Sequence, residues 1–188
     1  MTFIVKPLTP ELAIVFTEYL EKLDFSHANH WSTCFCRFYH CNCSSENWMK
    51  RSGKENRLEA IEEIKAGNMK GYLAFDGHKC IGWCNANNVQ EYSRLEDDLK
   101  PYIKEGKVGC IICFVIDPEY REQGVARLLL KEAVEGFKSQ GFNGVIALPV
   151  DIKNILEKRY RGTLNMYKEL GFKELDKDDD VSVMWLTI

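Results

Sequence analysis

The feature that most constrains the fold of this 188-residue chain is its longest strongly apolar run, Val108 to Ile116. Such a run, ended by the turn formers Asp117 and Pro118, is typical of a central strand that is covered on both faces of a sheet. An amphipathic pattern that begins near Gly124 and ends at Gly141 predicts a helix directly afterwards. The chain therefore centres on a buried strand followed by a helix.

Other segments predict further elements around this pair. A helix is expected from Thr9 as N-cap and Pro10 as its first residue, since both residue types favour these positions. Alternating patterns and turn signals give the rest. We expect strands at about 3–7, 71–75, 79–84, 144–150, 172–175 and 181–188, and helices at about 55–66 and 163–170. Loops are expected at 86–107, with room for a short helix, and at 176–180. We interpret residues 1–188 as a single α/β domain, a mixed sheet with helices on both faces.

Composition excludes two classes of protein. The chain carries 25 Lys and Arg against 28 Asp and Glu, a net charge of −3, whereas nucleic-acid-binding domains normally carry a basic surplus. The run from Val108 to Ile116 has about half the length that a membrane-spanning helix needs. No basic stretch followed by a long apolar region opens the chain, so no secretory signal is expected. These features predict a cytoplasmic protein that binds neither nucleic acid nor membrane.

Eight cysteines are present, and without a signal peptide we expect them to be reduced thiols. Four of them, Cys34, Cys36, Cys41 and Cys43, lie in an insertion at about 24–50 that is rich in histidine and aromatic residues. If each Cys-x-Cys pair lies on a strand, its two thiols share a face, and the two pairs could converge on zinc. The spacing differs from the usual Cys-x2-Cys, and the aromatic residues suit a pocket wall, so we expect no metal.

The segment from Val115 to Ala126 combines the end of the buried strand, a short loop and the start of a helix. The first N–H groups of a helix have no partner within it, and together with the helix dipole they make an anion site. Gly124 and Ala126 leave the backbone open to a phosphate, and Arg121 can add a charge-assisted contact. The segment therefore predicts a phosphate-binding loop.

The pattern Arg121-x-x-Gly124-x-Ala126 resembles the acyl-CoA pyrophosphate loop of the GNAT superfamily of N-acetyltransferases. A second stretch, Met166 to Lys173, resembles that family's second motif, a helix with a tyrosine followed by Gly-Phe and a strand. The order of elements agrees over nearly the whole chain, with departures at Tyr160, where many members have Asn, and at Thr163, where Ala is frequent. The resemblance implies a GNAT-like α/β (α+β) fold with a mixed, mostly antiparallel sheet of six to seven strands.

The resemblance also implies an activity, the transfer of an acetyl group from acetyl-CoA to a primary amine by direct attack in a ternary complex. Acetyl-CoA would lie between the strands at 108–116 and 144–150. The residues implied to bind it are Phe114, Val115, Ile116, Arg121, Glu122, Gln123, Gly124, Val125, Ala126 and Arg127. Tyr167 would act as the general acid that protonates the departing thiolate. Three candidates remain for the general base: Asp151, Glu91 and a water chain.

The acceptor side depends on segments outside these motifs. We expect 24–50 and 85–107 to shape it, because insertions around a fixed cofactor site usually set specificity. The predicted lining residues are Trp31, Phe35, Tyr39, Trp83 and Asn85. The expected partner is a small-molecule or peptide amine, and a homodimer is left open. Two alternatives remain: a non-catalytic acyl-CoA-binding regulator on the same fold, and a metal- or redox-sensing protein that uses the Cys34–Cys43 cluster.

Overall fold

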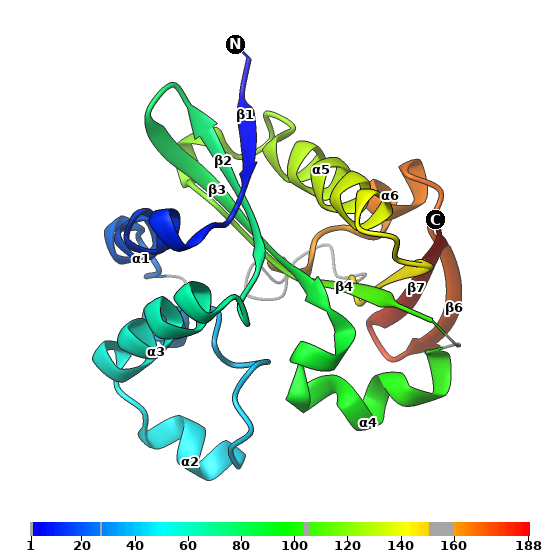
Figure 1. Ribbon diagram of the computed structural model, residues 1–188, viewed down its shortest axis with the longest axis horizontal. Coiled ribbons are helices and arrows are strands. Elements are labelled where there is room, and N and C mark those ends of the chain that lie inside the picture. The colour runs from blue at the N-terminus through cyan, green and yellow to red at the C-terminus, as the bar shows by residue number, and fades with distance from the viewer. Residues whose placement is uncertain (1, 27, 104–105, 151–159) are drawn as a thin grey trace.

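The computed structural model describes residues 2–26, 28–103, 106–150 and 160–188 (Figure 1). Within them a seven-stranded sheet has the order β1-β2-β3-β4-β5-β7-β6. Its neighbours pair antiparallel, except β4 and β5, which are parallel. The strands are β1 Ile4–Pro7, β2 Gly71–Asp76, β3 Lys79–Asn88, β4 Val108–Ile116, β5 Gly144–Ala147, β6 Lys173–Asp178 and β7 Val181–Thr187. This confirms the predicted mixed, mostly antiparallel sheet.

Helices cover both faces of the sheet, as predicted (Figure 1). On one face α1 (Ala13–Lys22) and α3 (Gly53–Ala66) pack against the β1–β3 half, and on the other α5 (Val125–Ser139) and α6 (Leu164–Glu169) pack against the centre. Two shorter helices, α2 (Ser45–Lys50) and α4 (Glu96–Leu99), lie in the connections. Helix α3 begins at a capping box in which Ser52 and Glu55 satisfy each other's backbone N–H groups.

Alternation along the strands builds a separate core on each face. Leu73 and Trp83 face α1 and α3, whereas their neighbours Ala74 and Cys84 face α5. Helix α5 lies close to the sheet because Gly109 of β4 has no side chain: a Cβ there would come within 2.7 Å of the Phe137 ring. The position of α5 is thus fixed by a large residue that packs onto a glycine.

Strands β4 and β5 separate part-way along their length. They pair only from Val108 with Gly144 to Ile111 with Ala147, although β4 continues to Ile116 along β3. Beyond Ala147 the chain stays with β7, since the N–H of Ser182 donates to the carbonyl of Pro149. Among the described residues, the remaining edge of β4 therefore has no strand partner on its β5 side.

A β-bulge lies where this separation begins. Asn85 is opposite Cys113 and Ala86 is opposite Ile111, so that Ile112 is an extra residue in β4. Before the bulge Ile111 packs towards α5, and after it Phe114 and Ile116 do so.

Three strand ends differ from the sequence predictions. Strand β3 continues to Asn88, and the predicted loop after it contains short helical turns and the short helix α4. Strand β5 ends at Ala147 rather than at 150, because β4 is no longer beside it. Strand β6 runs to Asp178, so most of the acidic segment taken for a turn lies on an exposed edge strand, whose polar side chains need no burial.

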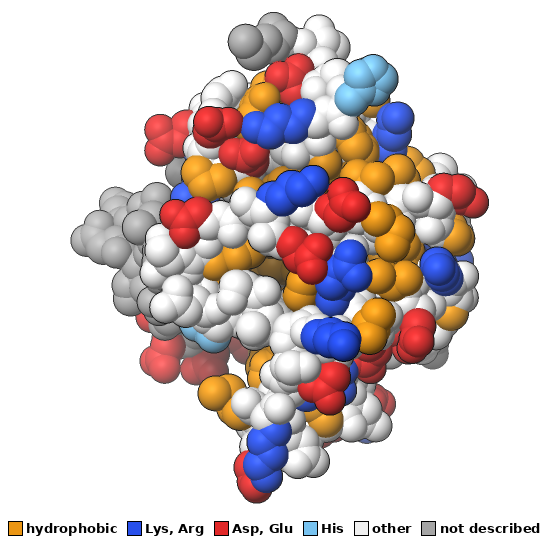
Figure 2. Space-filling view, turned by 90° about the vertical axis from the view of Figure 1, so that its left-hand side faces the viewer, with side chains coloured by type: hydrophobic (Ala, Val, Ile, Leu, Met, Phe, Trp, Pro, Cys, Tyr) orange, Lys and Arg blue, Asp and Glu red, His pale blue; other side chains and the backbone are white. Residues whose placement is uncertain are grey.

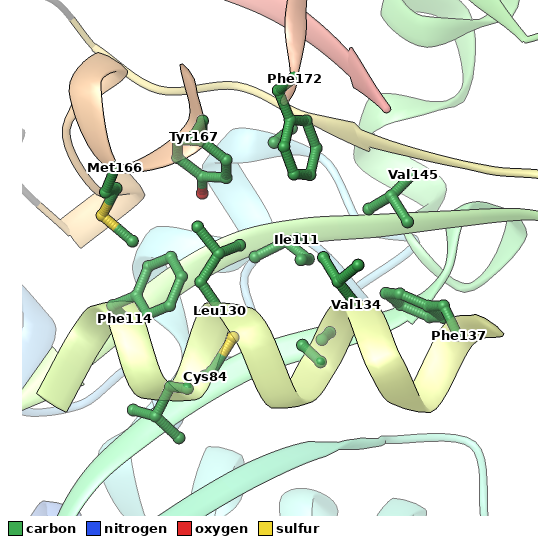
Figure 3. Close-up of a cluster of buried hydrophobic side chains, with 14 of the residues drawn as sticks. Cys84, Ile111, Phe114, Leu130, Val134, Phe137, Val145, Met166, Tyr167 and Phe172 are labelled. Carbon is green, nitrogen blue, oxygen red and sulfur yellow. The ribbon is translucent and has the colours of Figure 1, made fainter. Parts of the chain in front are cut away.

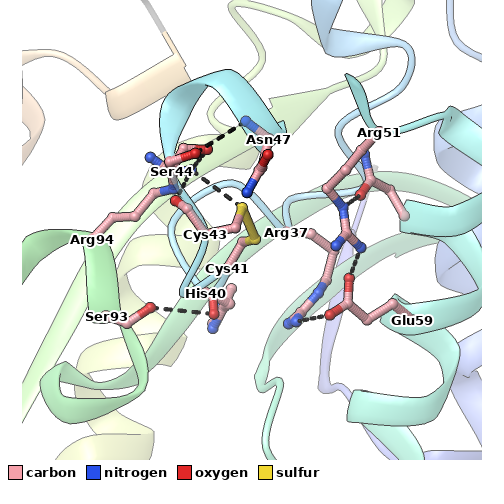
Figure 4. Close-up of a disulfide and its surroundings, with 11 residues drawn as sticks. Arg37, His40, Cys41, Cys43, Ser44, Asn47, Arg51, Glu59, Ser93 and Arg94 are labelled. Carbon is pink, nitrogen blue, oxygen red and sulfur yellow. Dashed lines mark hydrogen bonds and ion pairs between the residues drawn. A yellow bond between two sulfur atoms is a disulfide. The ribbon is translucent and has the colours of Figure 1, made fainter. Parts of the chain in front are cut away.

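The insertion consists of turns and short helices rather than strands, with Phe35 and Cys36 at positive φ. The zinc alternative, which we did not favour, required the paired cysteines to lie on a strand, and the described residues 28–50 contain no strand. Cys41 and Cys43 form a disulfide (Figure 4), which corrects the expectation that all eight cysteines are reduced. Their Cα atoms are 5.4 Å apart, within the range that a disulfide bridges. Among the described residues, no group of three or more His, Cys, Asp or Glu side chains could hold a metal ion.

The face formed by α1 and α3 carries charges of both signs interspersed with apolar side chains (Figure 2). Exposed large apolar residues on these helices include Ile14 and Leu58. None of the helices in the described part of the chain is long and apolar enough to cross a membrane.

Candidate functional site: a pocket where two strands separate

A pocket of about 330 Å³ lies where β4 leaves β5. Its lining includes all the residues that the sequence implied for cofactor binding except Gln123. The lining residues are Phe25, Trp31, Phe114, Val115, Ile116, Tyr120, Arg121, Glu122, Gly124, Val125, Ala126, Arg127, Tyr160, Gly162, Thr163 and Met166. The structure thus brings together the end of one strand, the start of one helix and an aromatic wall from two other segments.

The loop between β4 and α5 is held in place by polar contacts. The carboxylate of Asp117 accepts a hydrogen bond from the N–H of Glu119 (3.0 Å), which starts a short helical turn at Pro118. Lys79, in the β2–β3 hairpin, lies 3.1 Å from the carboxylates of both Asp117 and Glu119. These contacts join the loop to the sheet, so that the start of α5 is presented in one position.

Helix α5 begins at Gly124, which has a φ of 84°. This left-handed conformation strains other residues, which explains the glycine even though a Cβ there would meet nothing within 4 Å. No side chain caps the helix, and the N–H of Leu128 donates to the carbonyl of Gly124 at 3.0 Å. The N–H groups of the first turn are therefore available for an anion at the pocket wall.

Two arginines border this helix start, and one of them already has an anionic partner. Nε and Nη2 of Arg127 donate to the carboxylate of Glu169 on α6, at 2.7 and 3.1 Å. The hydrogen bond from Arg127 lowers the pKa of Glu169, so Glu169 is ionised at neutral pH. Nε of Arg121 makes only a long contact with the carbonyl of Ile116, at 3.4 Å. Arg121 is therefore the more available cation for a phosphate.

Tyr167 is fully buried between α5, β4 and the strand that follows α6 (Figure 3). Its ring lies 6.5 Å from that of Phe114 and 5.2 Å from that of Phe172, measured between centroids. Its hydroxyl donates to the carbonyl of Arg161 at 2.9 Å. Burial raises the pKa of Tyr167 well above its ordinary value, so the hydroxyl keeps its proton at neutral pH.

The five predicted acceptor residues separate into two groups. Trp31 lines the pocket, and Tyr39 reaches its wall because its hydroxyl lies 2.8 Å from that of Tyr160. Trp83 is fully buried, and its Nε1 donates to the sulfur of Cys36. Phe35 and Asn85 are buried as well and do not line the pocket.

Asn85 belongs to a buried polar cluster instead. Its Oδ1 accepts a hydrogen bond from the Tyr92 hydroxyl at 2.8 Å, and its Nδ2 lies 3.2 Å from Nε2 of His40. Nδ1 of His40 is 3.0 Å from the carbonyl of Glu91. Burial, reinforced by the charge of Arg37, lowers the pKa of His40 to about 4, so its ring is neutral at pH 7. The neutral ring then donates through Nδ1 and accepts through Nε2.

Several pocket residues were not predicted. Phe25, Tyr120, Gly162 and Met166 come from three separate parts of the chain. Tyr160 and Thr163 also line the pocket, and both are positions where the sequence departs from the GNAT pattern. Those departures were the available signal, because a substitution within a motif region places a new side chain at the motif's site. Of the candidate bases, Asp151 lies outside the described residues, and Glu91 contacts His40 through its backbone.

The model of the acetyltransferase (GNAT) family matches residues 29–172 of the sequence. The chain belongs to this family. The match begins within the insertion and includes both the strand–loop–helix unit and α6. No curated protein sequence matches the chain.

Solved structures of GNAT enzymes share the fold along the whole chain. A PaiA N-acetyltransferase from Thermoplasma acidophilum, in complex with coenzyme A, is 18% identical over 100% of both chains, with a TM-score of 0.58. A mosquito arylalkylamine N-acetyltransferase-like protein is 11% identical over 100% of both chains (TM-score 0.61). The ribosomal-protein-S5-alanine acetyltransferase of Vibrio fischeri is 16% identical over 100% of this chain and 93% of that chain (TM-score 0.56). At these identities the likeness concerns the fold alone.

The pocket of this GNAT protein suits an acyl-CoA thioester in two respects. The unpaired edge of β4 offers backbone groups to the amides of a pantetheine arm, and buried backbone groups need such partners. The uncapped start of α5, beside Arg121, offers N–H groups and positive charge to a diphosphate.

Proposed function

We propose that the protein is an acetyl-CoA-dependent N-acetyltransferase that acts on a primary amine. One observation carries the proposal: an unpaired strand edge and an uncapped helix start line the same pocket. An extended amide chain that ends in a diphosphate matches this pair of backbone surfaces. Membership of the GNAT family supports acyl-CoA as its identity.

Phe114 to Ile116 would hold the pantetheine arm by their backbone, and residues 121–127 would hold the pyrophosphate. Acetyl-CoA supplies the acyl group as a thioester. The amine nitrogen forms a bond to the thioester carbon, the carbon–sulfur bond breaks, and the sulfur leaves with the electron pair of that bond. Tyr167, whose hydroxyl is protonated at neutral pH, would give its proton to the sulfur. The proton that the nitrogen loses as the amide forms would pass to water, and water would return a proton to Tyr167. Its bond to the carbonyl of Arg161 would orient it and be exchanged during that step.

The amine must lose a proton before it attacks. An alkylammonium with a pKa of about 10.4 is neutral in only ~1 part in 2,500 at pH 7, which corresponds to about 4.6 kcal/mol. Strand β4 contains no acidic residue that could accept this proton directly. A water chain that leads out of the pocket is the base we favour.

The test is a thiol-release assay with acetyl-CoA and a panel of amines, peptides included, on the wild type and on Tyr167→Phe. Loss of the general acid should lower kcat by about 10²–10⁴ while the affinity for coenzyme A, measured by calorimetry, is retained. Tyr72→Phe is the matched control, because Tyr72 lies against Gly136 near the far end of α5. A wild type that binds acetyl-CoA but acetylates no amine would contradict the proposal.

That outcome would favour the second candidate function, an acyl-CoA-binding regulator. One observation supports this candidate: the Tyr167 hydroxyl is fully buried and is already engaged by the carbonyl of Arg161.

A further inference from the structure

Arg161 is a partly buried cation beside the pocket whose partners are two tyrosines. Its Nε donates to the hydroxyl of Tyr160 at 3.1 Å, and its Nη2 donates to the hydroxyl of Tyr39 at 2.8 Å. The guanidinium also lies near both rings, 5.6 and 5.8 Å from their centroids. Arg161 is thus held between the insertion and the segment that precedes α6.

The charge of Arg161 has no counter-ion among the residues that the structure describes. No described carboxylate lies within 4.0 Å of it, whereas Arg37, Arg57 and Arg127 each pair with a glutamate. Burial raises the pKa of Tyr39, so the hydroxyl of Tyr39 keeps its proton and supplies no negative charge. A cation removed from water without a counter-ion is costly, and an anionic ligand would offset that cost.

The geometry of the guanidinium indicates which anion would fit. Arginine has five N–H donors in a planar fork, and the two tyrosine hydroxyls engage only two nitrogens. The tyrosines fix the plane of the group and leave both N–H groups of Nη1 and the second N–H of Nη2, a fork of two nitrogens, for a ligand. A carboxylate, with two coplanar oxygens, matches such a fork better than a single-point acceptor.

Arg161 also connects the acceptor wall to the proposed general acid. Tyr160 lines the pocket and contacts Trp31, with the ring centroids 5.3 Å apart. The backbone carbonyl of Arg161 accepts the hydrogen bond of the Tyr167 hydroxyl. Arg161 thus contacts the acceptor wall through its side chain and the proposed general acid through its backbone.

We propose that Arg161 binds a carboxylate of the acceptor, and that the acceptors of this enzyme are amino acids. This inference rests on the proposed acetyltransferase function and adds the substrate class. Arg161 acts as a specificity-determining residue: it holds the carboxylate, while the amine on the same molecule faces the thioester. Amines without a carboxylate leave its charge unpaired and bind more weakly.

The first experiment measures binding without chemistry. The wild type, saturated with coenzyme A, is titrated calorimetrically with each of the common L-amino acids and with the α-carboxamide of each. We expect at least one amino acid to bind ten- to a hundredfold more tightly than its own carboxamide. Equal affinities for every pair, or no binding of any amino acid, would overturn the proposal.

Variants of Arg161 assign the preference to this side chain. Arg161→Gln keeps N–H donors for the tyrosines but removes the charge, and it should abolish the preference for the acid while coenzyme A still binds. Arg57→Gln, which removes a surface partner of Glu21, is the control and should keep the preference. An unchanged preference in Arg161→Gln would contradict the assignment. If that variant does not fold, the wild-type comparison of acids with carboxamides decides alone.

Activity then separates the two proposals. Acetylation that favours an acid over its carboxamide, chiefly through KM, supports both. Acetylation of amines with no preference for acids keeps the proposed function and overturns the role of Arg161. A calorimetric preference for acids without any transfer keeps the carboxylate site and contradicts the acetyltransferase.

Discussion

The two walls of the pocket are built in different ways. The proposed cofactor wall comes from one continuous segment, residues 114–116, 120–122 and 124–127. It offers mainly backbone groups: the uncapped start of α5 and the edge of β4 that has no partner strand among the described residues. The acceptor wall consists of side chains from distant segments, such as Trp31, Tyr39 and Tyr160, which contact one another across more than a hundred residues of sequence. A backbone site needs only the right elements in the right order, whereas a side-chain site needs particular residues to meet.

This comparison predicts that substitutions on one wall change the binding of one substrate without changing the binding of the other. The largest effect is expected from Gly124→Glu on the cofactor wall, which should weaken coenzyme A binding at least a hundredfold. The new carboxylate would stand where the helix start is proposed to hold a diphosphate, and it would repel it. Calorimetry with coenzyme A measures the change.

Gly141→Glu at the other end of α5 is the matched control. Its φ is 72°, a Cβ there also meets nothing within 4 Å, and so it introduces the same strain and the same charge. Binding of coenzyme A should stay within about twofold of the wild type. Equal losses in both variants would mean that general destabilisation, and not the phosphate site, explains the effect.

The insertion behind the acceptor wall should make stability depend on pH through His40. The pKa of His40 in the folded protein, about 4, lies below the ordinary value of 6.5. Between these two pH values the ring is protonated in the unfolded chain but neutral in the folded protein. The stabilisation is complete above pH 6.5 and is lost as the pH falls towards 4. Between pH 7 and pH 5 we expect a loss of about 1–2 kcal/mol in the free energy of unfolding.

Urea unfolding of the wild type and of His40→Gln at several pH values measures this contribution. The difference between the two proteins should shrink as the pH falls from 7 to 5, since only the wild type carries the titrating ring. A constant difference would show that His40 titrates normally in the folded protein.

A smaller effect is expected from Tyr39→Phe on the acceptor wall. The substitution removes the hydroxyl that contacts both Tyr160 and Arg161, so the guanidinium is held less firmly. The KM for the acceptor should rise about three- to tenfold, and the affinity for coenzyme A should not change. A parallel loss of coenzyme A binding would show that the walls are coupled.

The smallest effect is expected from Glu169→Gln. Its carboxylate holds Arg127 by two exposed hydrogen bonds, and solvent screens such surface pairs, so they add little to stability. Release of Arg127 for the phosphate should tighten coenzyme A binding about two- to threefold, most clearly at low salt. Weaker binding in this variant would indicate that Glu169 orients Arg127 for the ligand.

The same contrast explains what could be predicted from the sequence. The central strand, Val108 to Ile116, has the predicted bounds, because a long apolar run between turn formers has one good interpretation. The start of helix α5 directly after Gly124 could also be predicted, because it depends only on that glycine and on the amphipathic pattern that follows it. All the residues that the sequence implied for cofactor binding, except Gln123, therefore line one pocket.

Interactions between distant segments could not be predicted in this way. Trp83 and Asn85 alternate with residues of the other face, but only the packed structure shows that the insertion closes over them. The ends of β5 and β6 depend on which neighbouring strand is present, and local sequence does not specify that. The Cys41–Cys43 disulfide depends on the backbone conformation of a turn, and periodic sequence patterns do not predict that conformation.

The extra residue at Ile112 has one more consequence. Because it reverses the alternation of β4, the even-numbered side chains Phe114 and Ile116 reach the α5 face, although Ile111 faces the same way. A chain that lacked this single residue would keep both sequence motifs. However, Phe114 and Ile116, at the end of the strand proposed to hold the thioester, would then point to the opposite face of the sheet. The parity of one strand therefore decides whether the recognisable motifs in this protein can be assembled into a working site.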